Sequence, residues 1–123
     1  TPLLEDDDPN FAQHPQWGTY EFDFKKRFTK DFLGSNLDFI LKMFHLDGIR
    51  VDAVQSMLNL NYGRSANARL NRKGTGDNLD AKGFLRNVTS YTHKKYPGVL
   101  LMAEEAGGFP NLTRPVNERG VNV

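Results

Sequence analysis

Two carboxylate residues of this sequence lie at the ends of short apolar runs, where charged side chains could do chemistry. Asp52 stands in the segment DGIRVDAV, two residues after Arg50, and Glu104 directly follows the run VLLMA. Residues two apart in a strand point the same way, so Arg50, Asp52 and Val54 would share one strand face. Charges on a buried face are costly unless they are paired, so this arrangement requires a partner or a use.

The spacing of these groups is typical of one class of reaction. Neighbouring strands lie ~4.8 Å apart, so carboxylates at matching heights would be roughly 5 Å apart, as in retaining glycosidases. There, one carboxylate attacks the anomeric carbon and the other protonates the leaving oxygen. We expect Arg50 to keep Asp52 ionised and the apolar run before Glu104 to help keep that residue protonated. On spacing alone, a structural ion pair between Arg50 and Asp52 is the alternative.

Short helices and strands must position these residues. Apolar residues recur at helical spacing behind Thr29, a candidate N-cap, and predict a helix over 29–45. The pattern further predicts a buried strand over 48–54, a helix capped by Asp77 or Asn78 and ending near 94–95, and a strand over 99–103. Long loops are expected over 1–28, 59–77 and beyond the second strand.

The alternation of helices and strands indicates an α/β fold. It predicts parallel strands joined by right-handed crossovers, with both faces of the sheet covered. A barrel suits the charged residues better than a flat sheet, because the carboxyl ends of barrel strands open into a catalytic mouth. No domain boundary is expected within residues 1–123.

Composition argues against several classes of partner. The chain has 123 residues, with 16 basic and 15 acidic residues and a formal net charge of +1. This balance, and basic residues at 64, 69, 72 and 73 without interleaved aromatics, argue against nucleic acid. No apolar run approaches the roughly 18 residues of a membrane span. The absence of cysteine agrees with a reducing compartment, so we expect a cytoplasmic protein.

The residues singled out above resemble the alpha-amylase superfamily. In that superfamily, a strand motif of the type DGxRxDA carries the nucleophile, and the next strand ends in a glutamate acid/base. The similarity is strongest to bacterial-type glycogen branching enzymes and extends from residue 3 to about 116. The matching segments are LLEDDDPNFAQHPQWGT, DFLGSNLDFILKMFHLDGIRVDAVQSMLNLNYGR, DNLDAKGFLRNV and YPGVLLMAEEAGGFPNLTRPV.

The resemblance implies a part of a (β/α)8 barrel, about strands 4 and 5 with their helices and long loops. It implies that Asp52 is the nucleophile, Arg50 its partner and Glu104 the acid/base. The implied enzyme is a transglycosylase without a cofactor or metal. It would cut an α-1,4-glucan such as amylose, glycogen or a maltooligosaccharide, hold the fragment on Asp52, and pass it to a 6-hydroxyl to form an α-1,6 branch. An α-glucan hydrolase of the same superfamily and a non-catalytic glucan-binding module are the alternatives.

Several loop residues are candidate glucan contacts. Trp17 could stack on a sugar ring or anchor its loop on the core. Tyr62 and Arg64 could reach glucan hydroxyls or simply pack the long loop. Glu105 would point away from the catalytic side and contact substrate at most, and Arg114 could pair with it or join it in the substrate contact.

Other polar residues are expected to be structural. None of the three histidines follows a metal-ligand spacing, so no metal site is expected. The acidic run 5–8 lacks the alternating spacing of a calcium loop and is expected to be a solvated face. The chain departs from the branching-enzyme pattern at Leu4, Asp6 and Asn10, where that family usually has tyrosine, histidine and arginine.

A complete barrel has eight strands and roughly 250 residues. The superfamily's third carboxylate, its flanking barrel strands and the accessory domains have no counterpart in this sequence. We therefore expect a fragment of one catalytic domain that is inactive alone. Open strand edges and half-covered helices are expected to make it associate.

Overall fold

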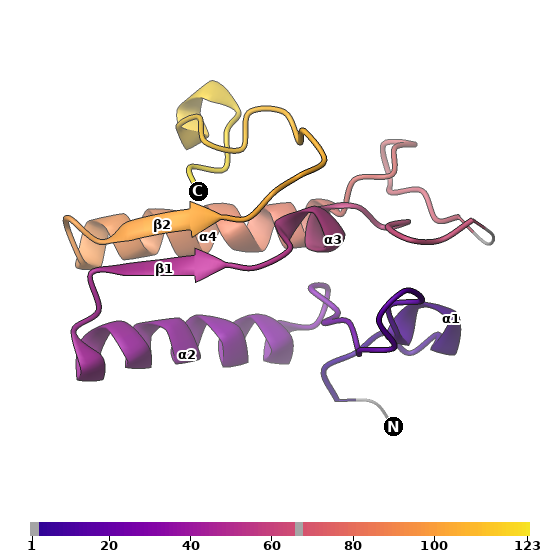
Figure 1. Ribbon diagram of the computed structural model, residues 1–123, viewed down its shortest axis with the longest axis horizontal. Helices are drawn as coiled ribbons and strands as arrows, with labels where there is room; N and C mark the ends of the chain where they lie inside the picture. Colours follow the sequence, from indigo (N-terminus) through magenta and orange to yellow (C-terminus); the bar gives the residue numbers. More distant parts are fainter. Residues whose placement is uncertain (1–2, 66–67) are drawn as a thin grey trace.

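The structure is a computed structural model that describes residues 3–65 and 68–123. Its elements along the chain are α1 (Pro9–Ala12), α2 (Arg27–Phe44), β1 (Gly48–Val51), α3 (Val54–Leu58), α4 (Leu79–Lys95), β2 (Leu100–Ala103) and the short 3-10 helix η1 (Val116–Glu118) (Figure 1).

The two strands form a parallel pair, as the sequence predicts. Gly48 lies opposite Leu100 and Val51 lies opposite Ala103, so the strands are in register over their whole length. The chain passes from β1 through α3 and α4 before it returns as β2. The carboxyl ends of both strands point toward α3 and the loops around α1 (Figure 1).

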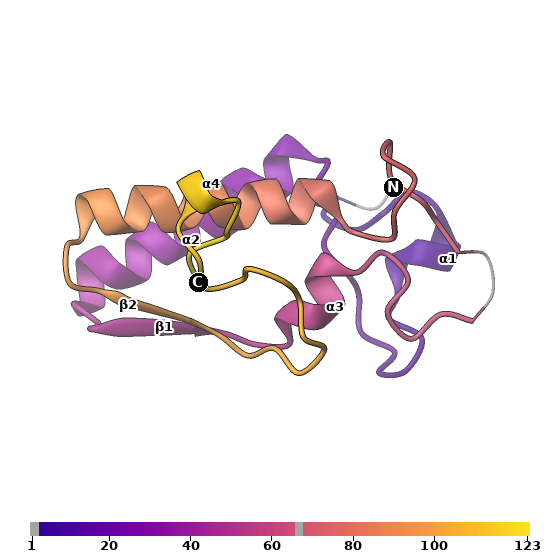
Figure 2. The same cartoon turned by 90° about the horizontal axis from the view of Figure 1, so that it is seen from above.

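Among residues 3–65 and 68–123, helices cover only one face of this sheet. Figure 2 shows α2 and α4 together on one side of the strands, and the two helices contact each other. The expectation that both faces would be covered is therefore wrong. The side chains on the opposite face are open to solvent, and Leu100 is 64% and Met102 47% exposed.

The boundaries of α2 and α4 agree with the sequence pattern, and one of their two expected caps is confirmed, whereas the short helices α1 and α3 were not predicted. Asn78 caps α4, because its side-chain oxygen accepts a hydrogen bond from the Ala81 N–H at 3.0 Å. Lys26, not Thr29, is the N-cap of α2. Thr29 is buried in the first turn of that helix, where its hydroxyl donates to the Leu4 carbonyl at 3.1 Å. It joins the helix to the N-terminal loop instead of starting the helix.

The first strand is shorter than predicted. It ends at Val51, and Ala53 has a left-handed backbone with φ of 47° that turns the chain into α3. Val54 is the first residue of α3 and is fully buried, so it does not share the exposed strand face with Arg50. The apolar residues after Asp52 are buried by a helix, a role that strand periodicity could not separate from a longer strand.

The core lies where α3 and α4 meet the N-terminal loop and the C-terminal segment. Phe24 packs on Phe84 with ring centroids 5.2 Å apart, and Leu58 and Val121 are fully buried beside them. The buried cluster consists of Phe24, Val54, Leu58, Ala81, Phe84, Leu85, Leu112, Val121 and Val123. This packing fixes α3 against α4, directly after the strand end that carries Asp52.

Much apolar surface stays outside this core. Thr29 and Leu41 are the buried residues of α2, whereas five large apolar residues on that helix are exposed. These exposed residues are Phe28, Phe32, Phe39, Met43 and Phe44. The expectation of half-covered helices is thus confirmed for α2. Within residues 3–65 and 68–123, no helix combines the length and apolarity needed to cross a membrane.

Candidate active site

The strand register places the two candidate carboxylates side by side. Val51 and Ala103 are the last paired residues, so Asp52 and Glu104 follow at matching positions on adjacent strands. The backbone of Glu104 secures this arrangement: its N–H donates to the Val51 carbonyl at 2.8 Å, and its carbonyl accepts from the Val54 N–H at 2.9 Å. The expected matching height of the two residues is therefore confirmed.

Arg50 bridges the two carboxylates. Its Nη1 lies 3.2 Å from Asp52 Oδ1, and its Nη2 lies 2.9 Å from Glu104 Oε1. All three side chains are substantially exposed, at 57% for Arg50, 75% for Asp52 and 49% for Glu104. The site is thus open to a solvent-borne substrate, and the ion pairs alone contribute little to stability.

The pKa values of the pair shift in directions opposite to the expectation from the sequence. The hydrogen bond to Glu104 and the negative charge of that residue raise the pKa of Asp52, more than the Arg50 charge lowers it. The pKa of Glu104 is lowered by the same hydrogen bond, by the Ala53 N–H that donates to Oε2 at 3.0 Å, and by Arg50. The sequence led us to expect a lowered pKa for Asp52 and a raised pKa for Glu104, and it could not show the donor that the turn at Ala53 supplies to Glu104.

A cavity of about 510 Å³ adjoins this site. Arg50 and Asp52 line it from the strand end, and His14, Trp17 and Tyr20 line it from the N-terminal loop. Its walls are predominantly apolar, with a few polar groups, the combination typical of small-molecule sites.

Arg64 belongs to the loop packing. Its side chain is only 6% exposed, and its Nη2 lies 2.8 Å from the Gln13 carbonyl and 3.0 Å from Glu21 Oε1. Of the two roles considered for Arg64, the structure supports packing between loops over contact with glucan hydroxyls.

Trp17 and Tyr62 lie together with a histidine that the sequence pattern did not single out as a site residue. The Trp17 ring stacks on His14 with centroids 4.0 Å apart and an interplanar angle of 15°. The Tyr62 ring is 5.1 Å from His14 and 5.7 Å from Trp17. Trp17 is 51% exposed, so it is not a buried anchor for its loop. The three-residue spacing of His14 and Trp17 in HPQW is the signal that could have linked them.

Glu105 and Arg114 do not pair with each other. The Glu105 carboxylate accepts hydrogen bonds from the backbone N–H groups of Gly107, Gly108 and Phe109, at 2.8, 2.8 and 3.1 Å. Arg114 instead lies 3.6 Å from Glu118. The expected pairing is therefore wrong, because Glu105 organises the loop that directly follows it.

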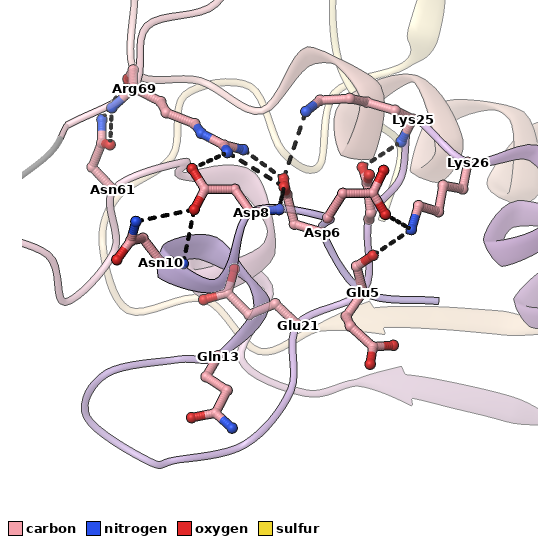
Figure 3. Close-up of polar contacts among 12 residues, drawn as sticks. Glu5, Asp6, Asp8, Asn10, Gln13, Glu21, Lys25, Lys26, Asn61 and Arg69 are labelled. Atoms are coloured by element: carbon pink, nitrogen blue, oxygen red, sulfur yellow. Dashed lines mark hydrogen bonds and ion pairs between the residues drawn. The ribbon is translucent and has the colours of Figure 1, made fainter. Parts of the chain in front are cut away.

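The acidic run is a set of ion pairs that joins two loops (Figure 3). Arg69 donates to both Asp6 and Asp8, and the Asp6 side chain is only 16% exposed. Burial alone would raise the pKa of Asp6, but hydrogen bonds from Arg69 and the Asp8 N–H outweigh it and lower that pKa. Lys26 Nζ contacts Asp7 at 2.9 Å. The expectation of a solvated face is therefore wrong for Asp6.

Arg69 also stacks on a buried aromatic ring, with its guanidinium carbon 3.5 Å from the centroid of Phe11. Arg64 and Arg69 thus clamp together the described parts of two loops, over 3–28 and 59–77. Trp17 lies in the first of these loops and Tyr62 in the second. The partners of these arginines lie 43 to 63 residues away along the chain, so sequence spacing could not reveal them.

Comparison with known proteins shows what the sequence of this chain is similar to. No protein-family model matches the chain. The chain is 44% identical over 122 residues to the 1,4-alpha-glucan branching enzyme GlgB of Nitratidesulfovibrio vulgaris (strain DP4). Similar enzymes occur in Oleidesulfovibrio alaskensis, at 42% identity, and in Nocardia farcinica, at 43%.

These matches take in nearly all of this chain and a small part of each relative. Each covers 98% of the chain but only 16 to 19% of the relative's length. The chain is thus homologous, over almost its entire length, to one segment of the bacterial 1,4-alpha-glucan branching enzymes.

Proposed function

We propose that this chain carries the nucleophile and the acid/base of a 1,4-alpha-glucan branching enzyme. One observation carries the proposal: Asp52 and Glu104 lie side by side at the ends of parallel strands, bridged by Arg50, in a chain homologous to such enzymes. The proposed setting is a (β/α)8 barrel, to which β1 and β2 would contribute about strands 4 and 5.

The proposed reaction is a double displacement with retention of configuration. An Asp52 carboxylate oxygen attacks the anomeric carbon of an α-1,4-linked glucose unit, while Glu104 gives its proton to the departing 4-oxygen. The glucan fragment is then held as an ester of Asp52. In the second step Glu104 removes the proton from the 6-hydroxyl of an acceptor glucan. That oxygen attacks the anomeric carbon, and the bond to Asp52 breaks.

The protonation of the pair must suit the first step. The pKa of Asp52 is raised by its hydrogen bond with Glu104 and by that residue's charge. Attack requires an ionised Asp52 and a protonated Glu104, and Arg50 contacts both carboxyl groups. Arg50 would stabilise the nucleophile once Asp52 has lost its proton.

A segment exchange tests this function. The homologous 122-residue segment of the Nitratidesulfovibrio vulgaris enzyme would be replaced by that of this chain. We expect the hybrid to raise the α-1,6 linkage content of amylose without net release of reducing ends. Asp52→Asn should abolish this activity, and Glu104→Gln should lower kcat by about 10²-fold or more because the general acid is lost.

Asp47→Asn is the matched control, because Asp47 is an exposed carboxylate that precedes the opposite end of β1. It should leave the branching rate unchanged. Net release of reducing ends by the hybrid would instead identify a hydrolase. Full branching activity in the Asp52→Asn hybrid would refute the catalytic role of this chain.

A further inference from the structure

The exposed indole of Trp17 rests on a fixed base. His14 stacks on one face of the ring at 4.0 Å between centroids, and Tyr62 packs at 5.7 Å. Trp17 is nevertheless 51% exposed, whereas His14 is only 2% exposed. Because His14 covers one face of the indole, the other face accounts for much of this exposure. A large apolar ring surface is thus held open at a constant orientation.

His14 carries unused hydrogen-bonding capacity beneath this ring. Among the described residues, neither Nδ1 nor Nε2 of its buried side chain has a hydrogen-bond partner. Buried polar atoms without a partner are rare and call for an explanation. Burial lowers the pKa of His14, and the charge of Arg64 adds to the shift while that of Glu21 opposes it. A neutral imidazole can donate one hydrogen bond and accept another, as a sugar hydroxyl requires.

The same cavity connects these rings to the candidate nucleophile. His14, Trp17 and Tyr20 line it together with Arg50 and Asp52. A ligand chain that reaches Asp52 through this cavity therefore passes along the aromatic residues of the N-terminal loop. The clamp formed by Arg64 and Arg69 holds that loop in place.

We propose that Trp17, supported by His14, is a stacking platform for a glucose unit of an α-glucan chain whose reacting unit lies at Asp52. The inference deepens the proposed function and rests on it for the class of substrate. The C–H face of a pyranose ring would cover the open face of the indole. His14 would hold the indole in the orientation that this stacking needs.

Intrinsic fluorescence tests this platform directly, because Trp17 is the only tryptophan in the chain. The 123-residue chain would be titrated with maltohexaose and, in parallel, with β-linked cellohexaose. We expect a saturable change in emission with maltohexaose and a much weaker one with cellohexaose. A chain that gives no saturable change, or responds equally to both sugars, would overturn the proposal.

Calorimetric titration of variants separates stacking from a structural role. Trp17→Ala should weaken maltohexaose binding by about tenfold, and Trp17→Phe by less, because the smaller ring still stacks. Phe28→Ala, which removes an exposed aromatic that does not line the cavity, should bind as the wild type does. The platform would be refuted if Trp17→Ala binds maltohexaose as tightly as the wild type does. It would also be refuted if the only effect of Trp17→Ala is a lower melting temperature.

The platform and the proposed catalysis can fail separately. Asp52→Asn should keep the maltohexaose affinity of the chain, since binding at Trp17 needs no nucleophile. Binding that depends on Trp17, in a chain whose hybrid enzyme forms no branches, would leave the platform standing and refute the catalytic role. If the hybrid forms branches and Trp17→Ala leaves its KM for amylose unchanged, the catalytic role stands and the platform is refuted.

Discussion

At the scale of single residues, the site depends on how Glu104 is held. Arg50 contacts both carboxylates, but only Glu104 also receives the Ala53 N–H. The hydrogen bond with Asp52 is the main reason why the pKa of Glu104 is lowered, and the Ala53 N–H adds to that shift. The same hydrogen bond and the charge of Glu104 raise the pKa of Asp52. A backbone group in the turn thus contributes to the difference between two otherwise similar carboxylates.

The first prediction concerns this coupling. Glu104→Gln removes the negative charge and the carboxylate hydrogen bond that raise the pKa of Asp52, so that pKa should fall to its ordinary value of 3.8 or below. Titration of the ¹³C carboxyl resonance of Asp52 measures the change. The Asp47→Asn variant should leave the Asp52 titration unaltered. An Asp52 pKa that stays raised in Glu104→Gln would show that Glu104 is not its cause.

At the scale of elements, α2 and α4 are joined by a polar cluster at their contact. Asp38 on α2 accepts hydrogen bonds from Lys95, Tyr91 and Tyr96 at 2.8, 3.0 and 2.7 Å. The hydrogen bonds of Lys95 and Tyr96 are the main reason why the pKa of Asp38 is lowered to about 2. This cluster ties the helix before β1 to the helix before β2.

The second prediction follows from that pKa. Because folding lowers the pKa of Asp38 from 3.8 to about 2, its stabilising contribution is complete above the ordinary value and is lost as the pH falls through about 2. The wild type should therefore melt at a higher temperature than Asp38→Asn at pH 6, and the difference should shrink as the pH falls toward 2. Thermal melts followed by circular dichroism measure it. A difference that stays constant between pH 6 and pH 2 would contradict the assignment.

The elements also show which features the sequence could predict. The two long helices α2 and α4, the parallel strands and the Asn78 cap depend on local spacing and agree with the structure. The short helices were not predicted: α1 lies in an expected loop, and α3 begins in the expected strand. The early end of β1 depends on a left-handed alanine, a conformation that residue rarely adopts. The covered face of the sheet and the ion pairs of Arg69 depend on contacts between distant segments, which periodicity does not encode. Asp52 and Glu104 could be matched because each lies at the end of a short apolar run that predicts a strand.

At the scale of the whole molecule, many large apolar side chains of the described residues are exposed. The bare face of the sheet exposes Leu100 and Met102, and α2 exposes Phe32 and Phe39 among others. Exposed apolar side chains favour association with another apolar surface. A two-stranded parallel sheet also has two unpaired edges.

The third prediction is that the isolated chain associates through this surface. Sedimentation velocity should show concentration-dependent association of the wild type, because burying exposed apolar side chains is favourable. The double variant Phe32→Ser/Met102→Ser should shift the distribution toward monomer. Lys42→Ser, an exposed polar change on the same helix, should not. A wild type that remains monomeric over the whole concentration range would contradict the prediction.

The hydrogen bonds of Glu104 have a mechanical consequence. Its N–H, its carbonyl and its carboxylate are all bound to the backbone of residues 51 to 54, so the end of β2 is fastened to the turn that carries Asp52. We therefore expect the main chain at Asp52 and at Glu104 to move together when the surrounding loops shift. Under the proposed function, the main-chain spacing of the two acids would persist while substrate enters and leaves.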